Sequence, residues 1–323
     1  QDLLRLGDEE EGWTWAARAH DKDGYNVTAY NLVTLKTTLD EYKTLETDSF
    51  IVRMPAEEAP IFGNQVLDLL EEAKQVLSAK YGVELERRII IELFGNQKDF
   101  GVRTFGMPHN PGFLGVCFGN VITANSPSTQ GANPSNWRAV LWHEFCHVIT
   151  LTMTKNKMPR WLSEGISVFE ELERDPSWGQ SMTPEYRERI LNGKMTPVSD
   201  LSAAFMRASS GEDMQFAYYQ SCLVVQFLVE TYGIEAVSKV LSDLGEGLHI
   251  NKALSGNTIP VSALNKEFET YAQNLASELG KELNWDIPED SVIGISTGMA
   301  LATNPNNYYL LVEHSRQLVK SEN

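Results

Sequence analysis

The spacing of two histidines, His143 and His147, constrains this chain more than any other feature. Residues four positions apart lie on the same face of an α-helix, so both imidazole rings can bind one metal ion. Glu144 stands one step around the same helix, where its carboxylate can accept a proton from a water molecule at that ion. Apolar residues between positions 140 and 152 form a wide stripe, which predicts that this helix packs into a core.

A third ligand is expected on a second helix, because a catalytic zinc ion uses three protein ligands and keeps a fourth position open. Pro159 breaks the chain after the first helix, and the run from Trp161 to Glu171 has the apolar spacing of a second, mostly buried helix. Glu164 lies inside this run, where a carboxylate is costly unless it is paired or bound to a metal ion. We therefore predict that Glu164 is the third ligand.

Three further carboxylates, Glu170, Glu171 and Glu173, end the second helix in a charged cluster. Such a cluster at the end of a helix is expected to be solvated. Should Glu164 not bind the metal, Glu170 or Glu171 is the alternative ligand.

The pattern His-Glu-x-x-His is typical of zinc metallopeptidases, in which the glutamate is the general base. The metzincin subclass also needs a glycine three residues, and a histidine six residues, after the second histidine. Those positions hold Thr150 and Met153, so this subclass is excluded.

The motif at 143–147, followed by Pro-Arg-Trp-Leu-Ser-Glu-Gly at 159–165, resembles the gluzincin clan, specifically the bacterial peptidase MA-like group. Members of that group are often embedded in tetratricopeptide-repeat proteins. The resemblance implies an α+β, thermolysin-like peptidase domain with two lobes and zinc between them. Some gluzincins place an acidic residue four positions after the ligand glutamate, where it orients a ligand histidine. That position holds Val168 here, so we expect the residues that support the ligands to differ.

The resemblance also implies a tyrosine that faces the metal from the start of a later helix and donates a hydrogen bond to the oxyanion. Tyr218 is the candidate, and Tyr219 is one step away. The alternative is that both tyrosines pack in the core. The Gly-x-Met-Glu-Asn motif of the aminopeptidase branch is missing, so an endopeptidase is favoured over an exopeptidase.

Upstream of the first motif, two apolar runs flank Gly119-Asn120, which predicts a β-hairpin with a two-residue turn. In gluzincins an edge strand just before the zinc helix pairs with the substrate backbone, and the resemblance implies that strand at about Val121 to Asn125. An ordinary structural hairpin is the alternative. His109, in a turn-rich loop near the expected cleft, is interpreted as a surface histidine.

The chain is expected to contain three segments. Residues 1–49 form a helical, repeat-like segment, and residues 50–283 form the peptidase domain. Within that domain a small mixed sheet and the zinc helix occupy 50–152, and a helical lobe occupies 153–283. Residues 284–323 form a helical, repeat-like pair. The two flanks suit either a protein partner or simple decoration of the domain.

Composition argues against several classes of partner and of protein. A formal charge of −17 argues against nucleic acid or an anionic membrane as a partner, and no apolar run is long enough to span a membrane. The cysteines, Cys117, Cys146 and Cys222, form no disulfide pattern and are expected to be buried free thiols. The chain begins at Gln1 without a signal peptide, so we expect a processed product or an excised fragment. The resemblance favours the cell envelope or a secreted location.

The sequence therefore predicts a zinc peptidase acting on peptides or proteins, with Zn²⁺ held by His143, His147 and Glu164. Glu144 is the predicted general base and Tyr218 the predicted oxyanion donor. One alternative is a zinc-stabilised binding or scaffold module with little or no activity. Another is a metal hydrolase that acts on a non-peptide amide.

Overall fold

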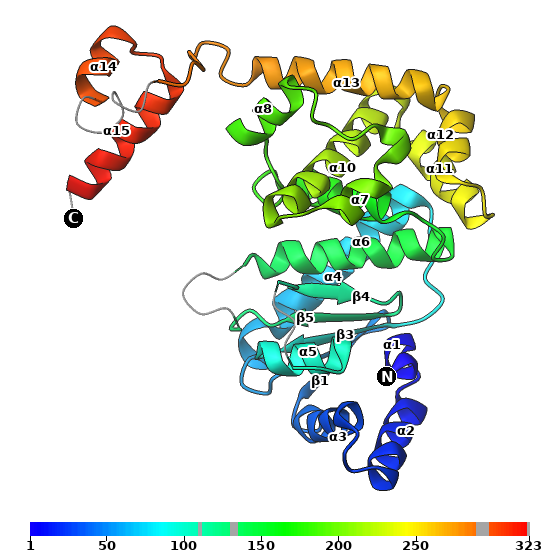
Figure 1. Cartoon of the computed structure of the whole chain (residues 1–323). Coiled ribbons are helices and arrows are strands. Elements are labelled where there is room, and N and C mark those ends of the chain that lie inside the picture. The colour runs from blue at the N-terminus through cyan, green and yellow to red at the C-terminus, as the bar shows by residue number, and fades with distance from the viewer. Residues whose placement is uncertain (109–111, 130–134, 289–296, 322–323) are drawn as a thin grey trace. The chain divides into compact units, whose positions relative to one another are not determined.

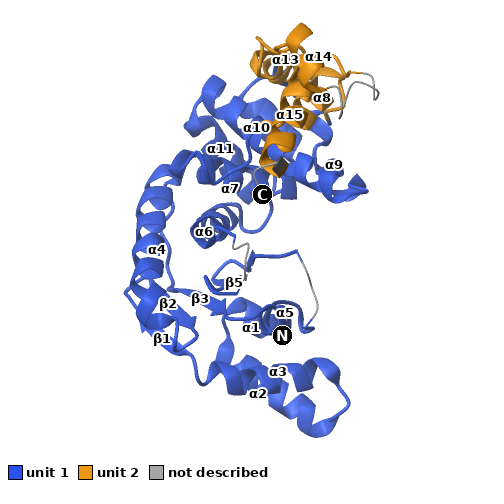
Figure 2. Ribbon diagram, turned by 90° about the vertical axis from the view of Figure 1, so that its left-hand side faces the viewer, with its two compact units in different colours: residues 1–181, 196–268 blue, residues 182–195, 269–323 orange. Residues whose placement is uncertain are grey.

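The computed structural model describes residues 1–108, 112–129, 135–288 and 297–321. Within them the chain is a mixed α+β protein with one five-stranded sheet and many helices, which confirms the predicted fold class (Figure 1). It forms two compact units, Gln1–Ser181 with Thr196–Phe268, and Met182–Met195 with Glu269–Asn323 (Figure 2). His109 and part of the loop before the helix that carries His143 lie outside the described residues.

The first half of the chain carries the strands and the second half is helical. The strands are β1 (Lys43–Glu46), β2 (Phe50–Met54), β3 (Ile89–Phe94), β4 (Gly115–Cys117) and β5 (Val121–Asn125). The helices are α1 (Asp2–Leu6), α2 (Glu9–Lys22), α3 (Val27–Leu39), α4 (Ala59–Tyr81), α5 (Gln97–Phe105), α6 (Trp137–Thr154), α7 (Arg160–Arg174), α8 (Pro184–Leu191), a short 3₁₀ turn (Val198–Asp200), α9 (Ser202–Arg207), α10 (Gly211–Tyr232), α11 (Ile234–Gly245), α12 (Ile250–Asn257), α13 (Val261–Glu278), α14 (Thr297–Thr303) and α15 (Tyr308–Ser321).

The strand order is β1-β2-β3-β5-β4, with β2, β3 and β5 parallel and the two outer strands antiparallel to their neighbours. The predicted two-residue turn joins β4 to β5, where the amide of Phe118 donates to the carbonyl of Val121 at 2.8 Å. Gly119 has φ +89° there, a conformation that glycine adopts without strain. The expectation that β5 is the edge strand was wrong. It pairs on both sides, and the edge belongs to β4.

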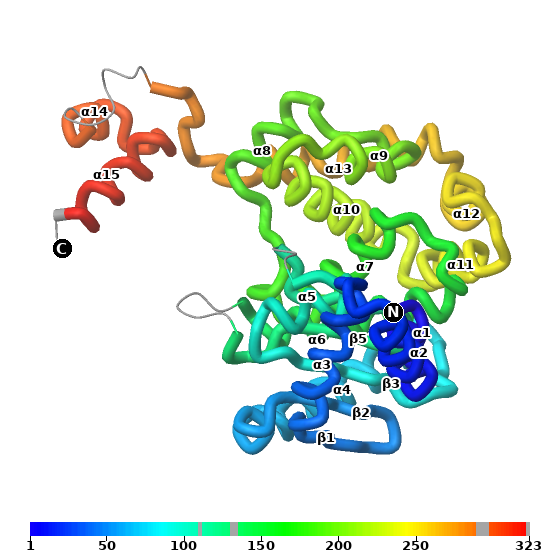
Figure 3. Tube along the Cα trace, turned by 60° about the horizontal axis from the view of Figure 1, so that its bottom comes forward, coloured from blue at the N-terminus to red at the C-terminus, as the bar shows by residue number. Residues whose placement is uncertain are grey.

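The N-terminal helices pack onto the sheet and not away from it. Leu4, Leu32 and Leu35 form one buried cluster with Phe94 of β3 and Phe100 of α5, and Figure 3 shows α1 to α3 beside these elements. The prediction of helix throughout residues 1–49 was wrong at its end, because residues 43–46 form strand β1. The first three helices therefore share a core with the sheet.

A buried ion network lies at this junction. Arg103 and Glu92 are both fully buried, and Nε of the arginine lies 2.6 Å from Oε2 of the carboxylate. Arg103 also donates to the carbonyl of Leu4 at 3.0 Å. Arg53 of β2 lies 3.2 Å from Glu92 and pairs with Glu9 of α2, so charges from two helices and two strands meet in one place.

Helix α6 lies between the sheet and the later helices α7 and α10 (Figure 1). Its N-terminus is capped by Asn136, whose side chain accepts from the amides of Arg138 and Ala139. Helix α7 packs closely on α10 at Gly165, where an added Cβ would lie 2.6 Å from the carbonyl oxygen of Ser221. Only a glycine lets the two helix backbones approach this closely.

In the second unit, the rings of Trp285 and Tyr308 are stacked at 4.6 Å, and the Arg187 guanidinium lies 4.2 Å from the tryptophan ring centre.

In the part of the chain that is described, no helix combines the length and apolarity that crossing a membrane demands. The three cysteines are free, as expected, but the side chain of Cys117 is only partly buried because it borders a cleft.

Candidate metal centre

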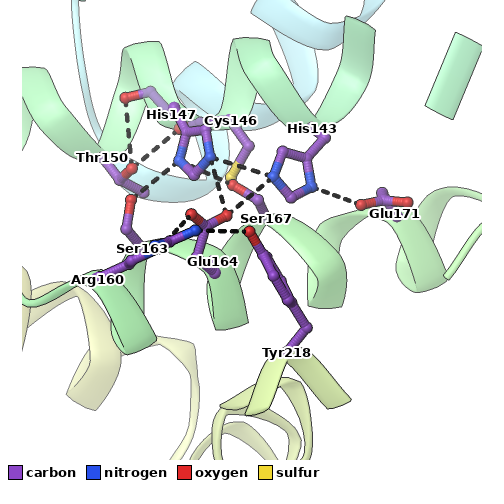
Figure 4. Close-up of polar contacts among 10 residues, drawn as sticks. All are labelled: His143, Cys146, His147, Thr150, Arg160, Ser163, Glu164, Ser167, Glu171 and Tyr218. Atoms are coloured by element: carbon purple, nitrogen blue, oxygen red, sulfur yellow. Dashed lines mark hydrogen bonds and ion pairs between the residues drawn. The ribbon is translucent and has the colours of Figure 1, made fainter. Parts of the chain in front are cut away.

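Helices α6 and α7 bring the three predicted ligands together (Figure 4). Nε2 of His143 lies 3.1 Å from Nε2 of His147. Oε2 of Glu164 lies 3.3 Å from the first of these nitrogens and 3.5 Å from the second. The side chains are 16%, 11% and 15% exposed, so the cluster is mostly shielded from solvent but reachable from one side.

The size of this triangle suits zinc. A tetrahedral zinc ion lies about 2.0–2.2 Å from nitrogen and oxygen ligands, which places ligand atoms about 3.3–3.6 Å apart. The three measured separations lie at or close to that range. Burial alone would raise the pKa of Glu164, but the hydrogen bonds and charges of His143 and His147 outweigh it and lower the pKa. The carboxylate is therefore ionised, as a metal ligand has to be.

His143 is held from behind by Glu171. Its Nδ1 lies 2.6 Å from Oε1 of that carboxylate, which is only 12% exposed. The expectation that Glu171 is solvated was wrong, because α7 packs on α6 and turns this residue toward the histidine. Burial would lower the pKa of His143, but the hydrogen bonds to Glu164 and Glu171 raise it well above 6.5. A metal ion therefore has to compete with a proton for this ring.

His147 is supported by two hydroxyl groups of α7. Its Nδ1 lies 3.0 Å from Oγ of Ser163 and 3.2 Å from Oγ of Ser167. Val168, where some gluzincins have an acid, is buried. The two histidines thus have different supports, a carboxylate for one and hydroxyls for the other, and these supports fix the ring orientations.

Glu170 points away from the site. It is 2% exposed, and it accepts from the Tyr81 hydroxyl at 2.5 Å and from Lys80 at 2.9 Å. The expectation that it is solvated was also wrong, since α4 covers this face of α7. Glu173 is 58% exposed, as expected. Glu170 is therefore engaged elsewhere, and Glu171 contacts the other ring nitrogen of His143.

Glu144 lies beside the triangle with its carboxylate unengaged. It is 7% exposed, and no hydrogen-bond donor contacts it among the residues described. Burial raises its pKa, helped by Glu164 and Glu171 and opposed by the two histidines. Gly115 of β4 lies directly against it, because an added Cβ would lie 2.8 Å from its Cγ and 2.9 Å from its Oε1.

Tyr218 enters from α10 with its hydroxyl toward Arg160 and Glu164 (Figure 4). Nη2 of Arg160 donates to the Tyr218 hydroxyl oxygen at 3.1 Å. Burial is the main reason why the pKa of Tyr218 is raised, so the hydroxyl keeps its proton at neutral pH. Tyr219 is 5% exposed and packs on Phe216, which makes it a core residue.

A cleft of about 940 Å³ opens over the cluster. Its lining includes the edge strand β4 and, from α10, Met214 and Tyr218. The cleft also touches residues 178–180, a loop that the sequence analysis did not identify. The contacts of Glu171 and Arg160 were missed as well, since they depend on how α7 meets its neighbours.

The sequence model of the peptidase MA superfamily matches residues 71–274, more than half of the chain. The match includes His143, His147 and Tyr218, and the three glutamates at 144, 164 and 171. The curated proteins include no match to this chain.

Proposed function

Because this chain belongs to the peptidase MA superfamily, we propose that it is a zinc-dependent endopeptidase of gluzincin type. The main support is a triangle of three ligand atoms whose separations suit a tetrahedral zinc ion. Next to it lies the buried carboxylate of Glu144, which no hydrogen-bond donor contacts among the described residues. Both features border the same cleft.

His143, His147 and Glu164 would hold the zinc ion, since two neutral imidazoles and one carboxylate are a common ligand set of catalytic zinc. When bound, zinc polarises the scissile carbonyl and lowers the pKa of the attacking water to about 7.

Glu144 takes the proton of the attacking water and then passes it to the leaving amine. This role is supported by the absence of any hydrogen-bond donor to its carboxylate among the described residues. Tyr218 donates a hydrogen bond to the oxyanion, and losing one such donor typically costs about 2.7–4 kcal/mol of transition-state stabilisation. The hydroxyl oxygen already accepts from Arg160, so its own proton is available for the substrate.

An extended peptide is the expected substrate. Strand β4 pairs with β5 on one side, which leaves backbone groups on its other side for an added strand. Residues of this edge and Tyr218 both line the cleft. Binding of this kind uses main-chain hydrogen bonds and favours peptide substrates over other amides. An origin in a tetratricopeptide-repeat protein and a protein partner for the flanks stay predictions.

The alternative of an inactive zinc-stabilised module is less well supported. Metal binding alone does not require a carboxylate at Glu144. The repeat-like flanks and the missing acid at position 168 motivated that alternative. Glu171, however, supplies a carboxylate contact to a ligand histidine.

The decisive experiment measures zinc by elemental analysis in the wild-type chain and in Glu164→Ala, followed by peptide hydrolysis with Glu144→Gln as the control. We expect about one zinc per wild-type chain, little in Glu164→Ala, and zinc without hydrolysis in Glu144→Gln. Hydrolysis that survives in Glu144→Gln would show that the general-base role is wrong. A wild-type chain that cannot be loaded with zinc would overturn the whole proposal.

A further inference from the structure

Arg160, the first residue of α7, contacts two members of the site at once. Its Nε lies 3.4 Å from Oε1 of Glu164, and its Nη2 donates to the Tyr218 hydroxyl at 3.1 Å. Glu164 uses its other oxygen, Oε2, toward the two histidines. The guanidinium therefore holds the carboxylate from the side opposite the ligand triangle (Figure 4).

The guanidinium is itself held by aromatic rings. Its central carbon lies 5.0 Å from the ring centre of Phe205 and 6.0 Å from that of Tyr218. Those two rings pack edge to face at 5.2 Å, and Phe205 is 7% exposed. Helices α7, α9 and α10 thus meet at this arginine, and the rings restrict its movement even though its side chain is 51% exposed.

The chemistry of the guanidinium suits this place. It is planar, always charged, and offers several N–H donors in a fixed fork, so it can serve two acceptors at a time. Its donation to Tyr218 makes the hydroxyl oxygen the acceptor and leaves the phenolic proton for another partner. A single ammonium group would carry the charge without this fixed fork.

We propose that Arg160 is a positioning residue that couples the third metal ligand to the oxyanion donor. It fixes the carboxylate of Glu164 so that Oε2 faces the histidines, and it aims the proton of Tyr218 into the cleft. The part that concerns Tyr218 rests on the proposed peptidase function. The part that concerns Glu164 rests only on metal binding.

Zinc affinity, measured by competition with a chelator, tests the first part. Arg160→Gln is expected to weaken zinc binding roughly 10-fold or more, as losses of residues behind a ligand do. Arg160→Lys should recover most of that affinity because it keeps the charge. Arg88→Gln is the matched control. Arg88 is 44% exposed and pairs with the carboxylate of Glu46 in β1. This variant should bind zinc as the wild type does.

Steady-state kinetics of the zinc-saturated variants test the second part. Arg160→Gln should lower kcat with little change in KM, and Arg160→Lys should not restore kcat, because a compact ammonium lacks the fixed fork that reaches both partners. In a Tyr218→Phe background the arginine change should lower kcat little further. Circular dichroism and thermal melting of each variant show that it is folded.

If Arg160→Gln binds zinc as tightly as Arg88→Gln does, the proposed link between Arg160 and Glu164 is wrong. Fully additive losses of kcat in the double variant overturn the link to Tyr218. A wild-type chain that binds zinc but cleaves no peptide overturns the proposed function instead. The zinc comparison then still decides whether Arg160 holds Glu164.

Discussion

Oε1 of Glu171 lies 2.6 Å from Nδ1 of His143, the ring nitrogen that faces away from the ligand triangle. Glu171 stands seven residues after Glu164, about two helical turns along the same face of α7. One helix therefore supplies a ligand in its first half and the support for another ligand in its second half. A carboxylate in this position fixes the ring and increases its basicity toward a metal ion.

Glu171→Gln tests that support. The amide oxygen still accepts a hydrogen bond, but the negative charge is lost, so zinc affinity should fall roughly 10- to 100-fold. Chelator competition measures the change. Glu173→Gln, on the same helix at 58% exposure, should leave zinc affinity unaltered. Equal losses in both variants would point to a general charge effect and not to this contact.

Gly115→Ala tests the contact between the edge strand and Glu144, the proposed general base. The new Cβ would lie 2.8 Å from Cγ of Glu144, so the carboxylate has to move. Misplacement of a catalytic group by about 1 Å can cost roughly 10²-fold in rate. We expect kcat to fall by that order while zinc content stays unchanged. Gly256→Ala, where an added Cβ meets nothing within 4 Å, is the control and should keep full activity.

Glu170→Gln tests a pH dependence of stability. Burial raises the pKa of Glu170 above 4.5, although Lys80 and Tyr81 oppose the rise. The folded chain then keeps a proton that the unfolded chain releases. The free energy of unfolding should fall as the pH rises from 4.5 through the raised pKa. Glutamine cannot titrate, so the variant should lose this part of the slope in urea unfolding, at a constant zinc level. Parallel pH curves for variant and wild type would contradict the prediction.

Arg103→Met tests the buried network that joins the N-terminal helices to the sheet. The change leaves Glu92 fully buried with one of its two arginine partners gone. Breaking a buried ion pair on one side typically costs about 3–5 kcal/mol. Urea unfolding should show a loss of that order. Arg88→Gln breaks an exposed pair with Glu46 and should cost at most about 1 kcal/mol. Similar losses in the two variants would mean that the buried pair contributes no more to stability than the exposed pair does.

The elements that carry the ligands were predictable because their signals are local. Apolar spacing and Pro159 predicted α6 and α7, and Gly119-Asn120 predicted the hairpin turn. Strand β1 was missed because its residues are mostly exposed and show no apolar alternation. The sequence did not show that β4, and not β5, is the edge strand. The pairing of β5 with β3 joins segments far apart in the sequence and leaves no local pattern, and β4 has only three residues.

The contacts behind the ligands were harder to predict for a physical reason. From the sequence alone, a carboxylate such as Glu171 is expected to be solvated. Only the packing of α7 on α6 turns it toward His143. The same holds for Glu170, which α4 covers. Charge and helical position were visible in the sequence. The neighbouring helix that each charge meets was not.

Gly165 has a consequence for how the site moves. Since an added Cβ at this position would lie 2.6 Å from the Ser221 carbonyl oxygen, the distance between the helices that carry Glu164 and Tyr218 is set by main-chain atoms. Main chain within a helix has no rotamers to exchange, so thermal motion shifts the two groups together more readily than it separates them. The glycine thus acts as a fixed spacer, and a larger residue there would widen the gap between Glu164 and the Tyr218 hydroxyl without touching either one.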